Sequence, residues 1–174
     1  MKRLLAVVLG LAVVLVTPGL ASAYPYPRPT ANQKAVEVVI ARALAARGVP
    51  FVYGGGDVNG PTRPADRPDA PADLPLRDPR SLTAGFDASG LIVYAFAGAG
   101  IKMPRTSGDQ YKVSQKIPPS LALPGDLIFY GPEGTQSVAL FIGNGQMVEA
   151  TDPVVTVSPV RFANMTPYVG RIIQ

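Results

Sequence analysis

The period of the apolar residues changes once along this chain, at Pro118-Pro119. Before this pair, apolar residues recur every three or four positions, and after it they form short alternating or β-branched runs. The first period is typical of helices that bury one face, and the second is typical of strands. Helices in one half and strands in the other predict an α+β domain.

Three helices are predicted in the first half. Residues 32–47 carry apolar side chains at helical spacing, with Gly48 after them as a stop. A second helix is expected to begin at Asp87, a suitable N-cap, and to end near Gly98. A third should follow Thr106, because Asp109 three residues later completes a capping-box-like start, and should run to about residue 115.

The second half predicts an antiparallel meander of about five strands, separated by Gly, Asn, Asp and Pro. The runs are 126–130, 137–142, 146–150, 154–157 and 168–173.

The turn between the second and third of these runs decides which side chains share a face. A two-residue loop at Asn144-Gly145 would place Leu140 opposite Glu149. A three-residue loop at 143–145, with Gly145 in the left-handed conformation, would place Ala139 opposite Glu149 instead, on the face that carries Ser137. We expect the second register.

The first 23 residues have the pattern of a secretory signal peptide. Lys2-Arg3 is followed by 13 uncharged residues and by the small-residue site at 21–23, so we expect export with cleavage after Ala23. A membrane anchor is the alternative, but a span needs about 20 apolar residues. Residues 24–31 then form a Pro-rich strap.

The segment 57–82 contains six Pro and nine charged residues and has no apolar period. An irregular segment of this length inside a domain is unusual. We interpret it either as a linker between two half-domains or as a lid or wall beside a groove.

Two residue types that carry much of hydrolase chemistry are missing, because the 174 residues include no Cys and no His. Disulfides, a thiolate nucleophile, Cys-liganded zinc and an imidazole base are thereby excluded. The acidic residues are scattered, so neither a metal nor another cofactor is predicted. The net charge of +4 forms no basic stripe, and nucleic-acid binding is not expected.

Five ordered motifs in residues 51–174 resemble the NlpC-type peptidoglycan endopeptidases, a family of papain-like cysteine peptidases. They are F-V-Y-G-G at 51–55, G-F-D-x-S-G-L at 85–91, M-P-R-T-S-G-D-Q at 103–110, P-G-D-L-I-F-Y at 124–130 and V-A-L-F-I-G-N-G-Q-M-V-E-A at 138–150. The resemblance implies a papain-like domain over residues 32–174, with 57–82 as an insertion.

The resemblance also implies that the catalytic positions are degenerate. The family's nucleophilic cysteine falls at Ala88, its base histidine at Ser137, and its third, ring-orienting position at Glu149. A methyl group can neither attack nor ionise. Ser89 is a poor substitute, because consecutive helical side chains point about 100° apart, and a Ser–Lys dyad would need a buried lysine.

A groove without a catalyst can still bind ligand. The resemblance implies that Arg105 and Ser107 flank this groove, with Arg105 able to pair with a stem-peptide carboxylate, and that Glu149 is free to accept from a ligand amine. Each candidate also has a structural reading: Tyr53 as a core aromatic, Arg105 as a solvated charge, Ser107 as a helix-start residue and Glu149 as an exposed strand residue. The substrate-binding residues we predict are Tyr53, Asp87, Ser89, Arg105, Ser107 and Glu149.

The resemblance therefore implies a secreted, non-catalytic peptidoglycan-binding protein of the cell envelope or cell wall, monomeric and free of the membrane after cleavage. Other cell-wall hydrolases are further candidate partners. One alternative is an interaction or regulatory partner of an active hydrolase, without glycan affinity of its own. Another is a hydrolase with an unrecognised nucleophile.

Overall fold

The computed structural model describes residues 29–66 and 82–174. Its helices are α1 (Thr30–Ala45), α2 (Ala88–Ala97) and α3 (Ser107–Val113). Its strands are β1 (Gln115–Ile117), β2 (Leu127–Tyr130), β3 (Ser137–Gly143), β4 (Gln146–Ala150), β5 (Val155–Pro159) and β6 (Val169–Arg171). The predicted α+β class is confirmed.

The three helices lie close to where the sequence predicts them. Asp87 is the N-cap of α2, and Thr106 is the N-cap of α3, where its hydroxyl accepts from the backbone N–H of Asp109. Helix α1 begins at Thr30, so residues 30 and 31 belong to the helix and not to the Pro-rich strap. Helix α3 ends two residues before the predicted end, because the chain enters an extended strand at Gln115.

The sheet of the described residues has six antiparallel strands in the order β1-β6-β2-β3-β4-β5. Only β2 to β5 form the predicted meander. The prediction missed β1, a strand of three residues. It located β6 within the run 168–173 but was wrong about its neighbours, because β6 lies between β1 and β2. The chain before β6 is held beside β2, where the Thr166 N–H donates to the carbonyl of Phe129. A pairing this distant in sequence leaves no local signal.

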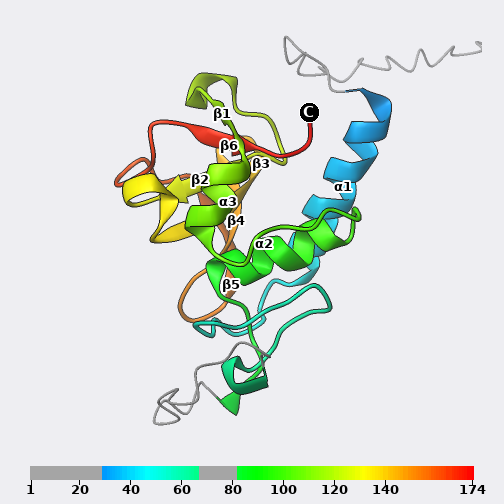
Figure 1. The fold of residues 1–174 in the computed structure, drawn as a ribbon, viewed down its shortest axis with the longest axis vertical. Helices are drawn as coiled ribbons and strands as arrows, with labels where there is room; N and C mark the ends of the chain where they lie inside the picture. The colour runs from blue at the N-terminus through cyan, green and yellow to red at the C-terminus, as the bar shows by residue number, and fades with distance from the viewer. Residues whose placement is uncertain (1–28, 67–81) are drawn as a thin grey trace, which may run out of the picture.

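Helices α1 and α2 pack together, and α2 also packs on β3 and β4, as Figure 1 shows. The main core lies between these helices and one sheet face and includes Phe96, Leu140 and Val148. A smaller apolar cluster with Ile128 and Met147 lies on the other face. Helix α2 is therefore held against the sheet.

The β3–β4 hairpin has the predicted register but not the predicted loop. Leu140 pairs with Val148 and Phe141 with Met147, which places Ala139 opposite Glu149. The loop itself has two residues, Asn144 and Gly145, both with positive φ. A bulge between residues 141 and 143 supplies the extra residue that restores the register.

Several sequence predictions fall on residues 1–28 and 67–81, outside the described residues. They include the signal peptide, most of the Pro-rich strap and most of the 57–82 insertion. The described start of that insertion is held by local contacts: Thr62 bridges to Gly85, and its hydroxyl accepts from the Gly56 N–H. Among the described residues, no helix is long and apolar enough to cross a membrane.

Candidate functional site

An open pocket of about 430 Å³ lies at the N-terminal end of α2, and we call it the α2 pocket. It is bordered by the 51–54 segment, the loop before α3, the start of β3 and the end of β4. Its lining residues are Phe51, Tyr53, Gly54, Asp87, Ala88, Ser89, Arg105, Thr106, Ser107, Thr135, Gln136, Ser137, Ala150 and Thr151. Ala88 and Ser137 thus line one pocket although 49 positions separate them in the chain.

The start of α2 is fixed against the glycine turn that follows Tyr53. The carboxylate of Asp87 accepts from the N–H of Gly90 at 2.6 Å, which caps the helix, and from the N–H of Gly54 at 2.9 Å. The N–H of Asp87 donates to the carbonyl of Gly55 at 3.0 Å. A Cβ at Gly90 would lie 2.1 Å from that carbonyl, so only glycine allows this approach.

Arg105 closes this network from the other side. Its Nη1 donates to Asp87 Oδ1 and to the Ser89 hydroxyl, both at 2.9 Å. Its Nη2 donates to Asp87 Oδ2 at 2.8 Å and to the carbonyl of Gly55 at 3.0 Å. Arg105 is therefore an internal partner of Asp87, in contrast to the predicted pairing with a stem-peptide carboxylate. Its position at the pocket matches the prediction.

The two degenerate positions provide neither a thiol nor an imidazole. The Ala88 side chain, partly exposed in the pocket, is a methyl group, and Ser137 across the pocket carries a neutral hydroxyl. The nearby Ser89 is buried, and its hydroxyl donates to Asp87 Oδ1 at 3.1 Å while it accepts from Arg105. Since Asp87 is saturated by hydrogen bonds and an ion pair, it is a poor base for Ser89.

Glu149 does not line the α2 pocket. Its carboxylate is buried and accepts from Arg161 through both oxygens, at 2.5 and 2.6 Å, and from the Ser158 hydroxyl. The prediction that Glu149 is free to accept from a ligand is therefore wrong, as is its reading as an exposed strand residue. Burial by itself would raise the pKa of Glu149, but the hydrogen bonds from Arg161 and Ser158 outweigh burial and lower this pKa.

Two other predicted residues have contrasting environments in the pocket. Tyr53 is 84% exposed, which excludes its reading as a core aromatic, and its ring is available to a ligand. Ser107 is the first residue of α3 and is buried at the pocket wall, so it is a helix-start residue and a lining residue at once. Ligand contact by either side chain stays a prediction.

The sequence analysis missed several polar residues of the pocket. Thr135 and Gln136 directly precede Ser137, and Thr151 directly follows β4. Their closeness in sequence to Ser137 and Glu149 could have predicted that they line the pocket. Thr106 was interpreted only as a cap. Arg161 had no signal, because it reaches Glu149 from beyond β5, 12 positions along the chain.

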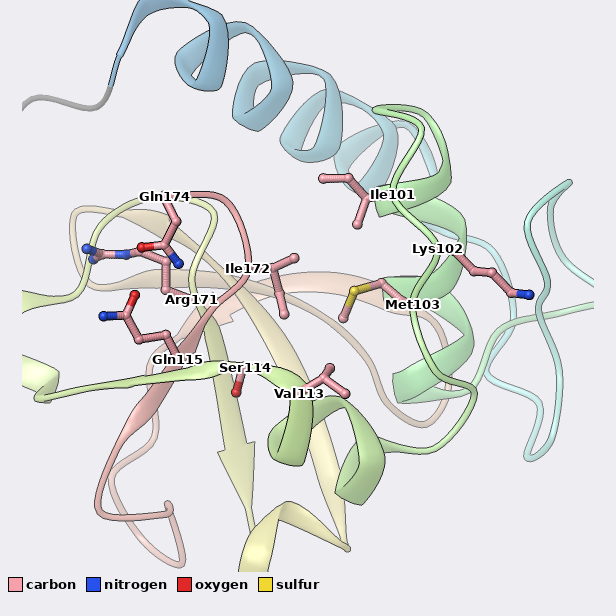
Figure 2. Close-up of a pocket in the computed structure, with 9 residues that line it drawn as sticks. All are labelled: Ile101, Lys102, Met103, Val113, Ser114, Gln115, Arg171, Ile172 and Gln174. Atoms are coloured by element: carbon pink, nitrogen blue, oxygen red, sulfur yellow. The ribbon is translucent and has the colours of Figure 1, made fainter.

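A second pocket, of about 500 Å³, lies between the segment after α2, the end of α3 and β6 (Figure 2). Met103, Val113 and Ile172 form its apolar part, whereas Arg171 and Gln174 gather at one end. The Arg171 guanidinium is paired with the buried Asp126. None of the predicted site residues lines this pocket. No acidic cluster among the described residues has the three ligands needed for a metal ion.

An α+β domain whose helix N-terminus faces a strand across an open pocket has the layout of a papain-like hydrolase domain. Residues 48–173, well over half of the chain, match the NlpC/P60 family, and the chain belongs to this family. It carries a peptidoglycan hydrolase-like domain without the cysteine.

Two relatives differ in activity: one is named as an endopeptidase and the other as a non-catalytic protein. The peptidoglycan endopeptidase RipB of Mycobacterium tuberculosis is 51% identical over 150 residues, which are 85% of this chain and 57% of RipB. The chain thus spans little more than half of that protein. The solved structure of M. tuberculosis RipD, described as a non-catalytic NlpC/p60 domain protein adapted to peptidoglycan binding, is 56% identical. It covers 79% of this chain and 97% of the RipD chain, with a TM-score of 0.70.

A third relative supports the assignment of the degenerate positions. RipA has been solved with mutations at a cysteine, a histidine and a glutamate, which are separated by 49 and 12 positions. The same intervals separate Ala88, Ser137 and Glu149. One of these RipA structures is 46% identical, covers 86% of this chain and 67% of the RipA chain, and has a TM-score of 0.72.

Proposed function

We propose that this chain is a secreted, non-catalytic protein that binds peptidoglycan through the α2 pocket. The observation that carries the proposal is the pairing of an intact pocket with the loss of both reactive groups. Ala88 and Ser137 occupy the positions of the family's nucleophile and base. The ion pair of Asp87 and Arg105, which shapes the pocket, is present.

The absence of hydrolysis follows from the residues present. Attack on an amide carbon needs an activated nucleophile and a base that accepts its proton. Removal of the nucleophile or the base from a catalytic triad lowers the rate on the order of 10⁶-fold. In this chain both are replaced, and Ser89 is bonded within the wall of the pocket.

Binding is supported by the character of the pocket. A cavity of about 430 Å³ is large enough for a short peptide or sugar segment. Tyr53 offers an exposed ring, and the hydroxyl groups of Ser137 and Thr151 can donate and accept hydrogen bonds. The adaptation to peptidoglycan binding described for RipD also supports a binding function.

We also propose that residues 1–23 direct export and that the mature chain acts at the cell envelope or cell wall. The tripartite pattern of this segment supports export. N-terminal sequencing of the protein recovered from culture medium or wall fractions should give Tyr24 as the first residue. A product that retains residues 1–23 would contradict cleavage.

The direct test of binding is sedimentation with purified peptidoglycan, with muropeptide release measured in the same tubes. We expect retention without release. Tyr53→Ala should lower retention several-fold. Phe162→Ala is the matched control, because Phe162 is also an exposed aromatic, at 75%, but lies outside the pocket lining.

Each alternative predicts a different outcome. Muropeptide release that is abolished by Ser89→Ala would establish a hydrolase with an unrecognised nucleophile. Absence of retention would favour an interaction or regulatory partner of an active hydrolase. Equal loss of retention in the two aromatic variants would move the binding surface away from the α2 pocket.

A further inference from the structure

The charges of the α2 pocket cancel within its own wall. Of its 14 lining residues, only Asp87 and Arg105 are charged, and they form a two-pronged ion pair. The remaining polar lining groups are hydroxyls, one side-chain amide and backbone groups. The pocket lining is therefore polar, and the charges of its side chains sum to zero.

Arg105 has no N–H left for a ligand. Each of its two terminal nitrogens makes two hydrogen bonds, shared among Asp87, Ser89 and Gly55. A terminal guanidinium nitrogen carries two hydrogens, so all four are used. The fifth N–H, on Nε, is buried without a partner and out of reach of solvent. A ligand carboxylate at this wall would find no cationic donor.

Asp87 is equally saturated toward ligand cations. Its Oδ1 accepts from the Gly90 N–H, the Ser89 hydroxyl and Arg105, and its Oδ2 accepts from the Gly54 N–H and Arg105. A ligand ammonium group would have to displace one of these donors. The wall that contains the only charges thus presents none to a ligand.

The sheet side of the pocket has no charged lining residue. Thr135, Ser137 and Thr151 line this side with hydroxyl groups. A carboxylate therefore finds no cationic side chain in this part of the lining either.

We propose, on the basis of the proposed function, that the α2 pocket selects the uncharged, amide-bearing form of peptidoglycan: stem-peptide segments whose carboxyl groups are carboxamides. A carboxylate that enters the pocket loses part of its hydration without gaining a charged side chain as a partner, which is costly. A carboxamide in the same place has two N–H donors and one acceptor, which hydroxyl groups can satisfy.

The test uses one batch of purified peptidoglycan divided in two. One half is treated with ammonium chloride and a carbodiimide, which converts free carboxyl groups to carboxamides, and the other half is treated without the carbodiimide. We expect the full mature chain to be retained at least five-fold more strongly by the amidated half. Retention on that half should not change between 50 and 500 mM NaCl.

The direction in which retention changes on amidation distinguishes binding in the α2 pocket from non-specific electrostatic binding. The chain has a net charge of +4, and removal of its two N-terminal cations by cleavage would still leave an excess of positive charge. Non-specific binding would therefore weaken when the polymer loses negative charge. Tyr53→Ala should abolish the gain on amidated polymer, and Phe162→Ala should preserve it.

The two levels of the proposal fail in different ways. Retention that is equal on both halves, or stronger on the untreated half, would overturn the selectivity while the proposed function stands. Retention on neither half would overturn the proposed function, and the selectivity would fall with it.

Discussion

Two carboxylate–arginine pairs, Asp87 with Arg105 and Glu149 with Arg161, differ in what they support. Asp87 and Arg105 join the start of α2 to the glycine turn and form part of the pocket wall. Glu149 and Arg161 join β4 to the segment after β5, outside the pocket lining. The first pair has both side chains mostly buried, whereas the Arg161 side chain is 48% exposed.

This difference shows that a carboxylate at a former catalytic position need not belong to the binding pocket. The Asp87 pair shapes the pocket whether or not a nucleophile follows it in the chain. Glu149, in contrast, has become a structural residue of the sheet: Arg161 binds its carboxylate and lies 4.9 Å from the ring centroid of Tyr130. Substitutions at the two arginines should therefore have separable effects.

The largest effect is expected for Arg105→Ala. This change leaves the Asp87 carboxylate largely buried and unpaired, and it removes four hydrogen bonds at the start of α2. The free energy of unfolding should fall by about 3 kcal/mol, the lower end of the cost for a broken buried pair. Urea unfolding with an unchanged m-value measures this loss.

Arg105→Lys is the matched control, because it keeps the charge but not the planar fork. Its loss of stability should be intermediate. If Arg105→Ala cost less than about 1 kcal/mol, the pair would not be the structural support of the pocket that the contacts indicate.

A smaller effect is expected for Arg161→Ala. Glu149 would lose two hydrogen bonds, but water can reach the space left by a half-exposed side chain, so we expect a loss of about 1–2 kcal/mol. Retention by peptidoglycan should be unchanged in this variant, since neither residue lines the pocket. If Arg161→Ala lost retention while its stability was unchanged, the Glu149 region would belong to the binding surface. The contrast between the two pairs would then be wrong.

The smallest effect is a change in the pH profile. The pKa of Glu149 lies below its ordinary value of about 4.5, so the unfolded chain takes up its proton first as the pH falls. This group therefore stabilises the fold above that value, and the contribution is lost as the pH falls through the lowered pKa. In Glu149→Gln, stability should fall less steeply below pH 4.5, as measured by thermal unfolding at a series of pH values.

A second carboxylate titrates in the same range and provides the control. The pKa of Asp109 is lowered by hydrogen bonds from Lys112 and Thr106. Asp109→Asn should remove only its own share of the acid-induced loss. If the profile of Glu149→Gln matched that of the unchanged protein, the Arg161 pair would not couple folding to pH.

Much of the fold could be predicted from the sequence because its signals are local. Apolar periods and caps located α2 and α3 to within about two residues at most boundaries, since a helix start depends on side chains three or four positions apart. The parity of β3 and β4 was also predictable, although the loop was not: a bulge and a two-residue turn give the same register as a three-residue loop.

The degenerate chemistry was fixed by the sequence as well. A chain without Cys and His has no thiolate and no imidazole in any fold, so Ala88 and Ser137 required no coordinates to be interpreted. The resemblance of the motifs to those of the NlpC-type family was enough to locate them.

Tertiary structure alone decided which charged side chains are paired within the protein and which are available to a ligand. Glu149 and Arg105 were both predicted to meet a ligand, and both are saturated by partners that lie 12 and 18 positions away in the chain. The same holds for β6, which pairs beside β2 and not beside β5. Residue types and local periods set what a side chain can bind, but burial and strand pairing bring distant groups within hydrogen-bonding distance, and these contacts determine which polar groups remain for a ligand.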